Sequence, residues 1–258
     1  MLGVKAYAKL NLYLEVKAKL PNGYHSLESQ VAFLEFADEV SIKESTTLSV
    51  SGIEIADNLI IKTAKLIQQK HKVTNGAEFT LKKNIPIGAG LGGGSADAAA
   101  AILLLNKLWG LNLAEQELYS LGSQIGADVP VCLYAQLTGC NSAFFSGVGD
   151  KITPAEKLPE KYYLLVNPRI ELATANVFHA FKFNNYPPRT NHLEEAAISI
   201  VPQIGDILDI LSNQESVIKH SMTGSGSTCF AIFATLEAAT AAAKNLDKSW
   251  WHAITKPI

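Results

Sequence analysis

The sequence predicts a protein of mixed α and β structure in two parts, and three observations support this. Near the N-terminus Leu12, Leu14 and Val16 alternate with other residues, which is the period of a strand with one buried face. The run 98–108 consists mainly of alanine and leucine, which are strong helix formers. The segment 154–159 begins and ends with proline and has the composition of a domain linker. We therefore expect strands and helices on both sides of this linker.

The other elements follow from the same two periods and from helix-capping residues. The pattern at 4–17 is interrupted at 8–11, which indicates a hairpin or a bent pair of strands. Further strands are expected at 31–43 (with a break near 37–38), 47–51, 77–83, 139–145, 149–153, 162–166, 229–234 and 250–255. Further helices are expected at 58–70 (capped by Asp57 or Asn58), 114–123, 173–181, 193–201, 203–211 and 236–246.

The composition indicates an ordinary globular protein. A chain of 258 residues with 48% hydrophobic residues can bury a sizeable core, and a net charge of −2 offers no field that attracts nucleic acid or an anionic membrane. Three cysteines, Cys132, Cys140 and Cys229, lie in apolar segments that resemble strands and show no metal-ligand spacing, so we expect buried, reduced thiols. We find no signal, transit or membrane-spanning pattern and expect a cytoplasmic protein without nucleic-acid or membrane partners.

A glycine-rich run is the most informative stretch of the chain. Five of the eighteen glycines lie within residues 88–94. Glycine accepts positive φ and leaves no side chain between backbone and ligand, so several N–H groups can converge on one anion. We expect Ser95 to cap the helix that follows and Asp97 to lie in its first turn. The N-terminus of that helix would then face the anion, and a phosphate chain is the expected ligand.

Three other interpretations of this run are weaker. Residues 88–93 also spell GxGxxG, but a dinucleotide site needs a second strand with an acidic residue about 20 residues later, and none follows. A Walker A loop needs a lysine where Ser95 and Ala96 stand. A flexible linker would not carry Ile87 and Leu91 among its glycines or lead directly into a helix. Phosphate binding is therefore the favoured interpretation.

The order of residues from Pro86 to Ala96 resembles the phosphate loop of the GHMP kinases, the superfamily of galactokinase, homoserine kinase and mevalonate kinase. The resemblance implies that ATP contacts this loop, with Asn58 beside the base and Lys83 near the adenine and phosphates. As a helix cap, Asn58 would need no such role. The loop residues implied in ATP binding are Pro86, Gly88, Ala89, Gly90, Leu91, Gly92, Gly93, Gly94 and Ser95.

The N-terminal stretch narrows the resemblance to one branch of the superfamily. Residues 8–12 (Ala-Lys-Leu-Asn-Leu) and 22–25 (Asn-Gly-Tyr-His) are similar to the signature of the GHMP kinases that act on a cytidine diphosphate-linked methylerythritol in the non-mevalonate isoprenoid pathway. The resemblance implies that Tyr24 stacks on the cytosine and that His25 contacts its polar edge. An aromatic ring and a hydrogen bonder with both a donor and an acceptor suit a pyrimidine.

Three more residues are implied in substrate binding by this resemblance. Asn11 would face the substrate, although on spacing alone Lys9 and Asn11 share a strand face that is compatible with a solvated surface. Thr174 and Phe178 lie four residues apart on one helix face and would help to form the wall of the cytidine pocket. Phe178 is equally compatible with a place in the ordinary core.

Asp128 is surrounded by small and apolar residues in the sequence Gly-Ala-Asp-Val-Pro at 126–130. On the residues alone, it is either the cap of a short turn or a partly buried acid that needs a cation, since burial raises the pKa of an unpaired carboxylate. The five residues match the catalytic-aspartate motif of the GHMP kinases. The resemblance implies that Asp128 is catalytic and that Lys9 is its counter-charge.

The C-terminal half carries a third motif and one departure. Gly224, Ser225 and Gly226 match the motif that supports the phosphate loop in the GHMP kinases, although a loop of glycine and serine is also a common turn. His192 follows Asn191 where these kinases usually have aspartate, which leaves the role of His192 open.

The resemblance covers nearly the whole chain and implies a fold and an activity. The implied fold is α+β in two domains, a strand-rich N-terminal domain at 1–153 and a ferredoxin-like C-terminal domain at 154–258. The implied reaction transfers the γ-phosphoryl group of ATP to the 2-hydroxyl of the cytidine diphosphate-linked polyol, with Mg²⁺ offsetting the developing charge. Ser95 and Asp97 are candidate metal ligands by position only. We expect a monomer or a weak homodimer.

Two rival functions remain open on these motifs. Another GHMP enzyme, such as a homoserine or mevalonate-type kinase or diphosphomevalonate decarboxylase, would share the phosphate loop but would lack the pyrimidine-binding residues at 23–25. A non-catalytic binding protein with this fold would keep the glycines and lose the charged pair, yet both Lys9 and Asp128 are present.

Overall fold

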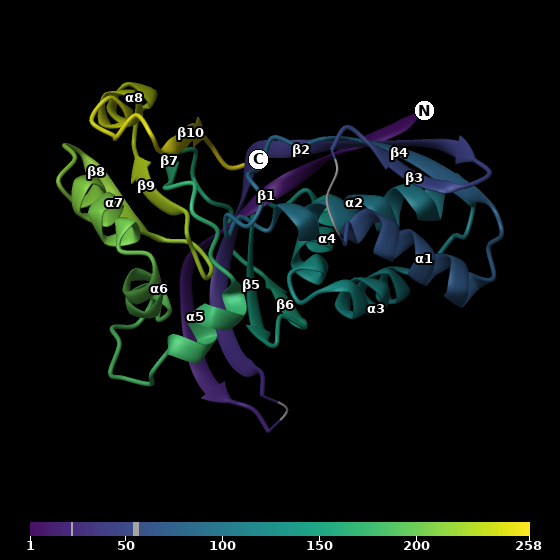
Figure 1. Cartoon of the computed structure of the whole chain (residues 1–258), viewed down its shortest axis with the longest axis horizontal. Helices are drawn as coiled ribbons and strands as arrows, with labels where there is room; N and C mark the ends of the chain where they lie inside the picture. The colour runs from purple at the N-terminus through teal and green to yellow at the C-terminus, as the bar shows by residue number, and fades with distance from the viewer. Residues whose placement is uncertain (22, 54–56) are drawn as a thin grey trace. The chain divides into compact units, whose positions relative to one another are not determined.

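Figure 1 shows the chain as a computed structural model that describes residues 1–21, 23–53 and 57–258. The chain forms two compact units. Unit 1 consists of residues 1–9, 36–86 and 92–140, and unit 2 of residues 10–35, 87–91 and 141–258. Strands β1 (Leu2–Lys19) and β2 (His25–Ser45) contribute to both units. Asn22, in the predicted turn between these strands, lies outside the described residues. The division into domains at 1–153 and 154–258 stays a prediction.

Strands β1 and β2 are continuous and pair with each other. The predicted interruption at 8–11 and the predicted break at 37–38 were therefore wrong. Every residue from 8 to 16 is buried, so both faces of β1 are covered there. A strand that is buried on both faces does not need alternating polarity, which is why the pattern misled the prediction.

Unit 1 combines a small sheet with four helices. Strand β4 (Gly76–Lys82) pairs antiparallel with residues 39–45 of β2 and parallel with β3 (Leu48–Ser51). The helices pack on one another, and Figure 1 shows them on one side of β3 and β4. They are α1 (Leu59–His71), α2 (Gly93–Leu108), α3 (Glu115–Ile125) and α4 (Val129–Thr138).

Helix α4 has no counterpart among the predicted elements. Its residues 129–135 are all buried, so it shows no amphipathic period that sequence patterns can detect. Cys132 lies in this helix and not in a strand, which corrects the expectation for that residue. Pro130 is in the first turn of α4, where its missing N–H leaves no hydrogen bond unmade.

Unit 2 contains two antiparallel sets of strands. Residues 27–32 of β2 pair with β5 (Ser142–Gly147), and β5 pairs with β6 (Lys151–Pro154). The other sheet has the order β10-β7-β9-β8, formed by β7 (Tyr162–Asn167), β8 (Val217–Met222), β9 (Cys229–Phe233) and β10 (Trp251–Thr255). The helices of this unit are α5 (Thr174–Ala180), α6 (Glu194–Ile200), α7 (Gln203–Ser212) and α8 (Leu236–Ala243).

The second sheet confirms the predicted ferredoxin-like arrangement. Strands β7, β8, β9 and β10 with helices before β8 and before β10 give the order βαββαβ, and all pairs in the sheet are antiparallel. Strand β8 was not predicted, because as an edge strand it keeps alternate residues exposed and is rich in polar side chains.

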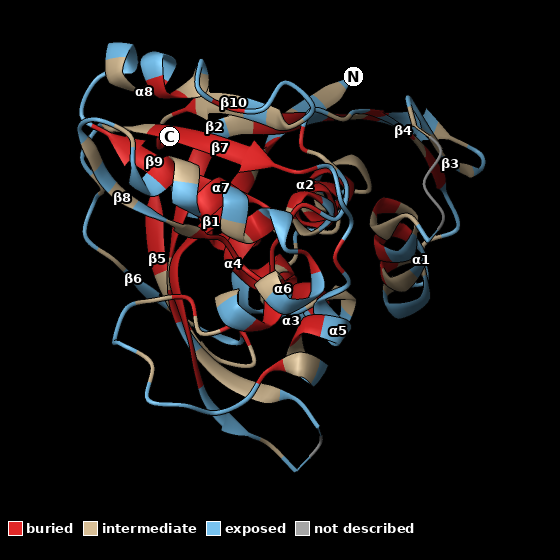
Figure 2. Ribbon diagram, turned by 60° about the vertical axis from the view of Figure 1, so that its left-hand side comes forward, coloured by how far each residue is buried: buried red, intermediate tan, exposed pale blue. Residues whose placement is uncertain are grey.

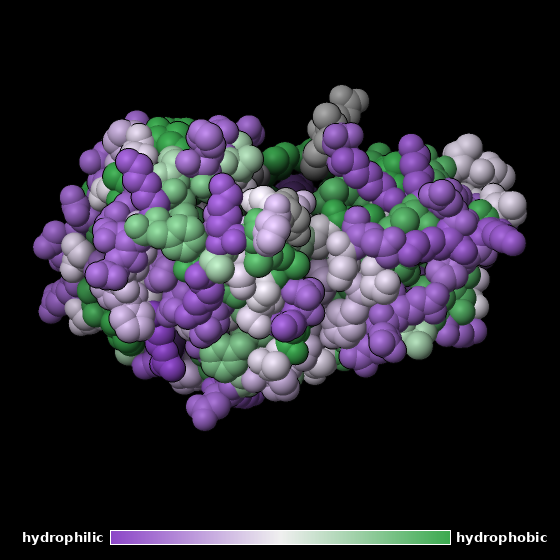
Figure 3. Space-filling view, turned by 90° about the horizontal axis from the view of Figure 1, so that it is seen from below, coloured by the Kyte–Doolittle hydropathy of each residue, from purple (hydrophilic) through white to green (hydrophobic). Residues whose placement is uncertain are grey.

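The central strands of this sheet form the core of unit 2. Figure 2 shows β7 and β9 as buried, and Leu164, Val166, Cys229, Ala231 and Phe233 on these strands belong to one hydrophobic cluster. Figure 3 shows a face of the molecule on which hydrophobic residues occur in small groups among hydrophilic ones. Within the described part of the chain, no helix is both long and apolar enough to cross a membrane.

Candidate active site

Lys9 and Asp128 form an ion pair in unit 1. Lys9 Nζ lies 3.1 Å from Asp128 Oδ2, and the Lys9 side chain is only 5% exposed, whereas that of Asp128 is 36% exposed. The aspartate therefore combines a cation on one side with access to solvent on the other. This is an arrangement that suits a proton-accepting carboxylate, because the ion pair fixes its position and a ligand can still approach.

The structure decides between the two roles left open for Asp128. The residue is at the N-cap position of α4, with φ −87° and ψ −8°, but its side chain makes no capping hydrogen bond. Its carboxylate is thus bonded to Lys9 and does not cap the helix. The partial positive charge at the start of α4 adds to the stabilisation of the negative charge.

Gly92 lies directly against the Lys9 side chain. A Cβ added at Gly92 would be 2.6 Å from Lys9 Cγ and 3.0 Å from Lys9 Cε, and the residue has φ +66°. Both the left-handed backbone and the contact with Lys9 therefore require glycine. The glycine-rich run and the Lys9–Asp128 pair meet at this residue.

Helix α2 begins two residues earlier than the predicted capping residue. Gly92 is its N-cap and Gly93 its first residue, so Ser95 lies inside the first turn and does not cap it. Asp97 lies beyond the first turn, and both expectations are therefore corrected. Gly93 and Gly94 allow the helix to start within the glycine run. The first N–H groups of a helix have no acceptor within the helix, which is the physical basis of the anion binding that we expect at this stretch.

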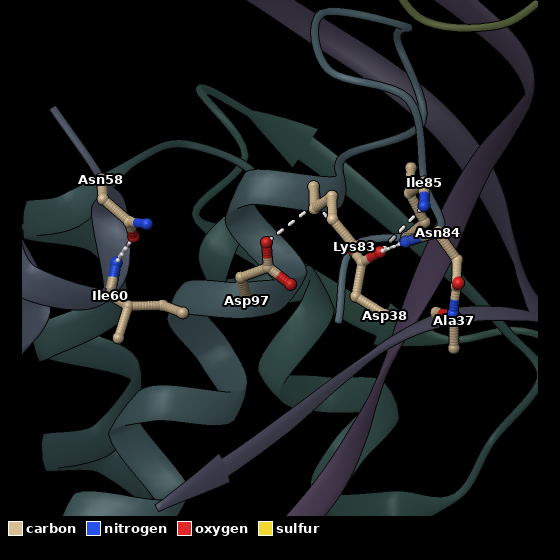
Figure 4. Close-up of polar contacts among 8 residues, drawn as sticks. All are labelled: Ala37, Asp38, Asn58, Ile60, Lys83, Asn84, Ile85 and Asp97. Atoms are coloured by element: carbon tan, nitrogen blue, oxygen red, sulfur yellow. Dashed lines mark hydrogen bonds and ion pairs between the residues drawn. The ribbon is translucent and has the colours of Figure 1, made fainter. Parts of the chain in front are cut away.

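Lys83 lies between two buried aspartates, as Figure 4 shows. Its Nζ donates to Asp97 Oδ2 at 2.8 Å and also to Asp38 Oδ2. The side chains of Lys83, Asp38 and Asp97 are 9%, 0% and 5% exposed. Burial raises the pKa of Asp97 to about 7, against the lowering by the Lys83 ammonium, and the Asp38 carboxylate adds to the rise.

Asn58 caps α1 as predicted. Its Oδ1 accepts from the backbone N–H of Ile60 at 2.9 Å (Figure 4). Its Nδ2 is buried and has no hydrogen-bond partner within the described residues. Leu59, the next residue, lies near the glycine run, since a Cβ on Gly94 would be 3.5 Å from Leu59 Cδ1. Asn58 therefore has a donor to offer near the loop in addition to its capping role.

The first half of the loop belongs to unit 2, where Gly90 approaches the third motif. A Cβ on Gly90 would be 2.6 Å from the carbonyl oxygen of Gly226 and 2.8 Å from that of Thr223, and Gly90 has φ +74°. Ala89 and Leu91 are buried on either side of it. Their side chains therefore anchor the loop, and only its backbone can serve as a ligand.

The third motif is held by polar side chains from distant parts of unit 2. Ser225 Oγ is 2.9 Å from Thr174 Oγ1, so two predicted site residues are bonded to each other. Asn11 donates from its backbone N–H to Thr223 Oγ1 at 2.8 Å. Asn191 Nδ2 donates to the carbonyl oxygens of Met222 and Gly224 at 2.8 and 2.9 Å. Asn191 and Thr223 were not among the predicted site residues, although Asn191 stands in the motif noted there.

His25 and Phe178, two residues of the predicted pyrimidine site, are in contact in unit 2. Their rings are stacked with centroids 4.9 Å apart and planes 20° apart. Burial, with a smaller contribution from Lys19, lowers the pKa of His25, so the ring is neutral at pH 7 and offers one donor and one acceptor. Tyr24 is 66% exposed beside it. Phe178 is only partly buried, so it lies at the edge of the core.

His192 has a structural place that explains how the chain tolerates it. Its Nδ1 accepts the backbone N–H of Val16 at 3.1 Å, and its ring stacks on Tyr186 with centroids 4.8 Å apart. A carboxylate at this position could accept the same N–H. Burial lowers the pKa of His192, which keeps the imidazole neutral and Nδ1 available as the acceptor.

The structure thus brings the predicted residues together in groups within each unit. In unit 1, Lys9, Asp128 and Gly92 form one group, and Lys83 lies near Gly93. In unit 2 the groups are Asn11 with the third motif, Ser225 with Thr174, and His25 with Phe178. Sequence reasoning missed Asp38, whose only signal was an acidic residue inside an apolar strand.

Comparison with known proteins gives the class of this arrangement. Residues 58–136 match the GHMP kinases N terminal domain, and residues 177–253 match the GHMP kinases C terminal domain. A mevalonate kinase structure from Methanococcus jannaschii superposes with a TM-score of 0.75, covering 100% of this chain and 98% of that one, at 14% identity, which shows the fold alone. The fold and the two matches place the chain among the GHMP kinases.

More similar relatives narrow the class. The 4-diphosphocytidyl-2-C-methyl-D-erythritol kinase of Chelativorans sp. (strain BNC1) is 36% identical over 94% of this chain and 90% of its own. That of Bradyrhizobium diazoefficiens is 37% identical over 96% and 95%. A crystal structure of 4-(cytidine 5'-diphospho)-2C-methyl-D-erythritol kinase covers both chains fully, with a TM-score of 0.84 and 28% identity. The chain belongs to this kinase family, and the resemblance inferred from the motifs is confirmed.

Proposed function

We propose that the chain transfers the γ-phosphoryl group of ATP to the 2-hydroxyl of 4-diphosphocytidyl-2-C-methyl-D-erythritol. The observation that carries this proposal is the Lys9–Asp128 pair at 3.1 Å, next to Gly92, the N-cap of α2. A kinase needs a group that activates the acceptor hydroxyl and a site that binds phosphate. The Lys9–Asp128 pair can serve as the first and the start of α2 as the second. The names of the relatives support the identity of the acceptor.

Asp128 accepts the proton of the acceptor hydroxyl. The Lys9 ammonium keeps the carboxylate ionised and stabilises the substrate oxygen as it becomes nucleophilic. Because phosphoryl transfer proceeds with little covalent help from the protein, holding these two groups in place is the main contribution of this part of the site. The buried Lys9 stem, packed against Gly92, fixes the ammonium.

ATP binds through its phosphates to the glycine run 88–95. In this proposal the unpaired N–H groups of the first turn of α2 bind the phosphate oxygens, and the positive end of the helix dipole adds to the attraction. Asn58 donates to the base from its Nδ2, which has no hydrogen-bond partner among residues 1–21, 23–53 and 57–258. Pro86, Ala89 and Leu91 hold the shape of the loop.

Magnesium fits this site as an ion held mainly by ATP phosphates and water. Mg²⁺ in kinases usually keeps several waters and takes one or two protein oxygens. Asp97 has one buried oxygen, Oδ1, without a hydrogen-bond partner within the described residues, and Ser95 supplies a hydroxyl in the first turn of α2. Side chains two residues apart on a helix point to different faces, so the chain would offer one of these two oxygens to the ion. The ion would offset the charge of the phosphates when bound.

The cytidine ring is recognised by unit 2. Tyr24 stacks on the base, and the neutral His25 offers both a donor and an acceptor to its polar edge. Phe178 and Thr174 form the wall of the pocket, and Asn11 contacts the substrate. We also propose that the enzyme works in the cytoplasm as a monomer or weak homodimer, with its two family domains divided near residue 153.

A substrate panel tests the function. The purified protein is incubated with ATP and Mg²⁺ and with one of three acceptors: the cytidylylated methylerythritol, mevalonate or homoserine. ADP formation and the phosphorylated product are measured. Product with the first acceptor alone supports the proposal, and turnover of mevalonate or homoserine in its place contradicts it. The variant Lys5→Met, on an exposed residue of β1, serves as the control for Lys9→Met, which should lose activity.

A further inference from the structure

The three buried charges of unit 1 stand out against an exposed pair one residue away. Lys83 bonds to Asp38 and Asp97, and all three side chains are less than 10% exposed. Lys82 and Glu39, the sequence neighbours of Lys83 and Asp38, form an ion pair at 2.8 Å with 67% and 55% exposure. Burying charged groups costs free energy unless each group finds partners. The buried cluster of Lys83, Asp38 and Asp97 therefore calls for an explanation, whereas the exposed pair of Lys82 and Glu39 does not.

Asp38 organises the segment that leads into the glycine run. Its Oδ1 accepts from the backbone N–H groups of Asn84 at 2.6 Å and Ile85 at 2.8 Å. Asn84 Nδ2 in turn donates to the carbonyl oxygen of Ala37 at 2.8 Å (Figure 4). One carboxylate thus holds the backbone immediately before Pro86 and, through Oδ2, the ammonium of Lys83.

The same segment lies against the start of α2. A Cβ on Gly93 would be 2.9 Å from both Lys83 Nζ and Ile85 Cγ2. Gly93 is the first residue of the helix whose N–H groups are to receive the phosphates. Any displacement of Lys83 or Ile85 would therefore move that turn, because packed interiors transmit small shifts.

We propose that Asp38 is a positioning residue for the ATP site. It fixes Lys83 and the backbone at 84–85, and these hold the first turn of α2 in the geometry that binds phosphate. Lys83 acts here as a support beneath Gly93, since its ammonium already bonds to two carboxylates. This inference rests on the proposed function and adds to it a residue outside the predicted site.

The test compares the inner and outer pairs. Asp38→Asn keeps an oxygen for the two backbone N–H groups and removes the charge that holds Lys83, and Glu39→Gln makes the same change on the surface. Affinity for a non-hydrolysable ATP analogue is measured by calorimetry, and KM is measured for the cytidylylated acceptor. We expect Asp38→Asn to weaken binding of the analogue about tenfold, which is about 1.4 kcal/mol, with the acceptor KM unchanged, because the first turn of α2 is then held less firmly in the phosphate-binding geometry. Glu39→Gln should change neither quantity.

A double-mutant cycle with Lys83→Met shows whether Asp38 acts through Lys83. In the Lys83→Met background, Asp38→Asn should have little further effect on the affinity for the analogue. If the fold-losses in affinity of the two single variants multiply fully in the double variant, the inference is overturned. So would a lower melting temperature of Asp38→Asn with unchanged affinity, because that is the result of a purely structural role.

Two further outcomes keep the test decisive. If Asp38→Asn does not fold, Asp38→Glu replaces it, since it keeps the charge, displaces the carboxylate by one methylene and should weaken the analogue without changing the acceptor KM. Normal affinity in that folded variant would contradict the inference. If the wild-type protein does not bind the ATP analogue, the proposed function fails. If the wild-type protein binds it and the Asp38 variants bind it with the same affinity, the inference about Asp38 fails.

Discussion

Gly92→Ala should impair turnover because the new methyl group would displace Lys9. The added Cβ would be 2.6 Å from Lys9 Cγ, while ordinary contacts begin at 3.4 Å, so Lys9 must move by about 1 Å. A misplacement of about 1 Å can reduce kcat about 100-fold. The positive φ of +66° adds a stability cost of about 1–2 kcal/mol, because a side chain is disfavoured there. Steady-state kinetics and thermal unfolding measure the two effects.

Gly139→Ala is the matched control. Gly139 is also in unit 1 and has φ +67°, but a Cβ there would meet no atom within 4 Å. This variant should lose similar stability and keep its kcat. If Gly92→Ala keeps a normal kcat, or if Gly139→Ala loses kcat equally, the displacement of Lys9 does not explain the effect and the reasoning is refuted.

Three further predictions concern substrate specificity, a buried ion pair and the pH dependence of stability. Tyr24→Ala should lose about 1–3 kcal/mol of acceptor binding, the range for base stacking, with ATP affinity unchanged. His25→Ala should reduce the preference for the cytidine substrate over its uridine analogue, and normal binding and preference in both variants would place the pyrimidine elsewhere. Lys83→Met should lower the free energy of unfolding by about 3–5 kcal/mol, because it leaves buried carboxylates without their cation. Lys82→Met, at the exposed pair, should leave the melting temperature unchanged, and an equal loss of stability in the two variants would contradict this prediction. His192 has a pKa below its unfolded value of about 6.5, so the stability that its neutral form contributes should be lost as pH falls below about 6.5. His192→Gln should reduce this dependence of the free energy of unfolding on pH. An unchanged dependence would exclude the hydrogen bond from the Val16 N–H to His192 as the cause.

Local signals predicted the elements that depend on local chemistry. Asn58 was one of two candidate caps for the helix 58–70, and the structure selects it through its bond to the Ile60 N–H. The glycine run predicted a helix start, because residues that accept positive φ stand directly before a run of alanines. Motifs of this kind have a physical cause within a few residues, so the sequence alone can reveal them.

Elements that depend on distant contacts were harder to predict. Helix α4 is buried on nearly all sides, so its sequence carries no period, and β1 lost its alternation for the same reason. Ser95 looked like a cap, yet α2 starts earlier because Gly92 adopts φ +66° against Lys9, a residue more than 80 positions away. Sequence patterns contain no direct record of such a contact.

The polar residues of the site divide in the same way. Lys9 and Asp128 could be named because each lies in a short motif, and their separation of 3.1 Å agrees with the expected pairing. Asp38 was missed, because its three partners at 83–85 are far away in the sequence and nothing near it in the chain distinguishes it from a surface acid. Burial and partner geometry identify it, and both are properties of the fold.

Asp128→Asn directly tests whether Asp128 accepts the proton of the substrate hydroxyl, because it replaces the carboxylate by a group of the same shape. The measurement is kcat with ATP and the cytidylylated methylerythritol, together with calorimetric affinity for an ATP analogue. We expect a loss of about 10²–10⁴-fold in kcat, the usual contribution of a general base, with affinity for the analogue unchanged. A variant that keeps a near-normal kcat would contradict the role of the Lys9–Asp128 pair.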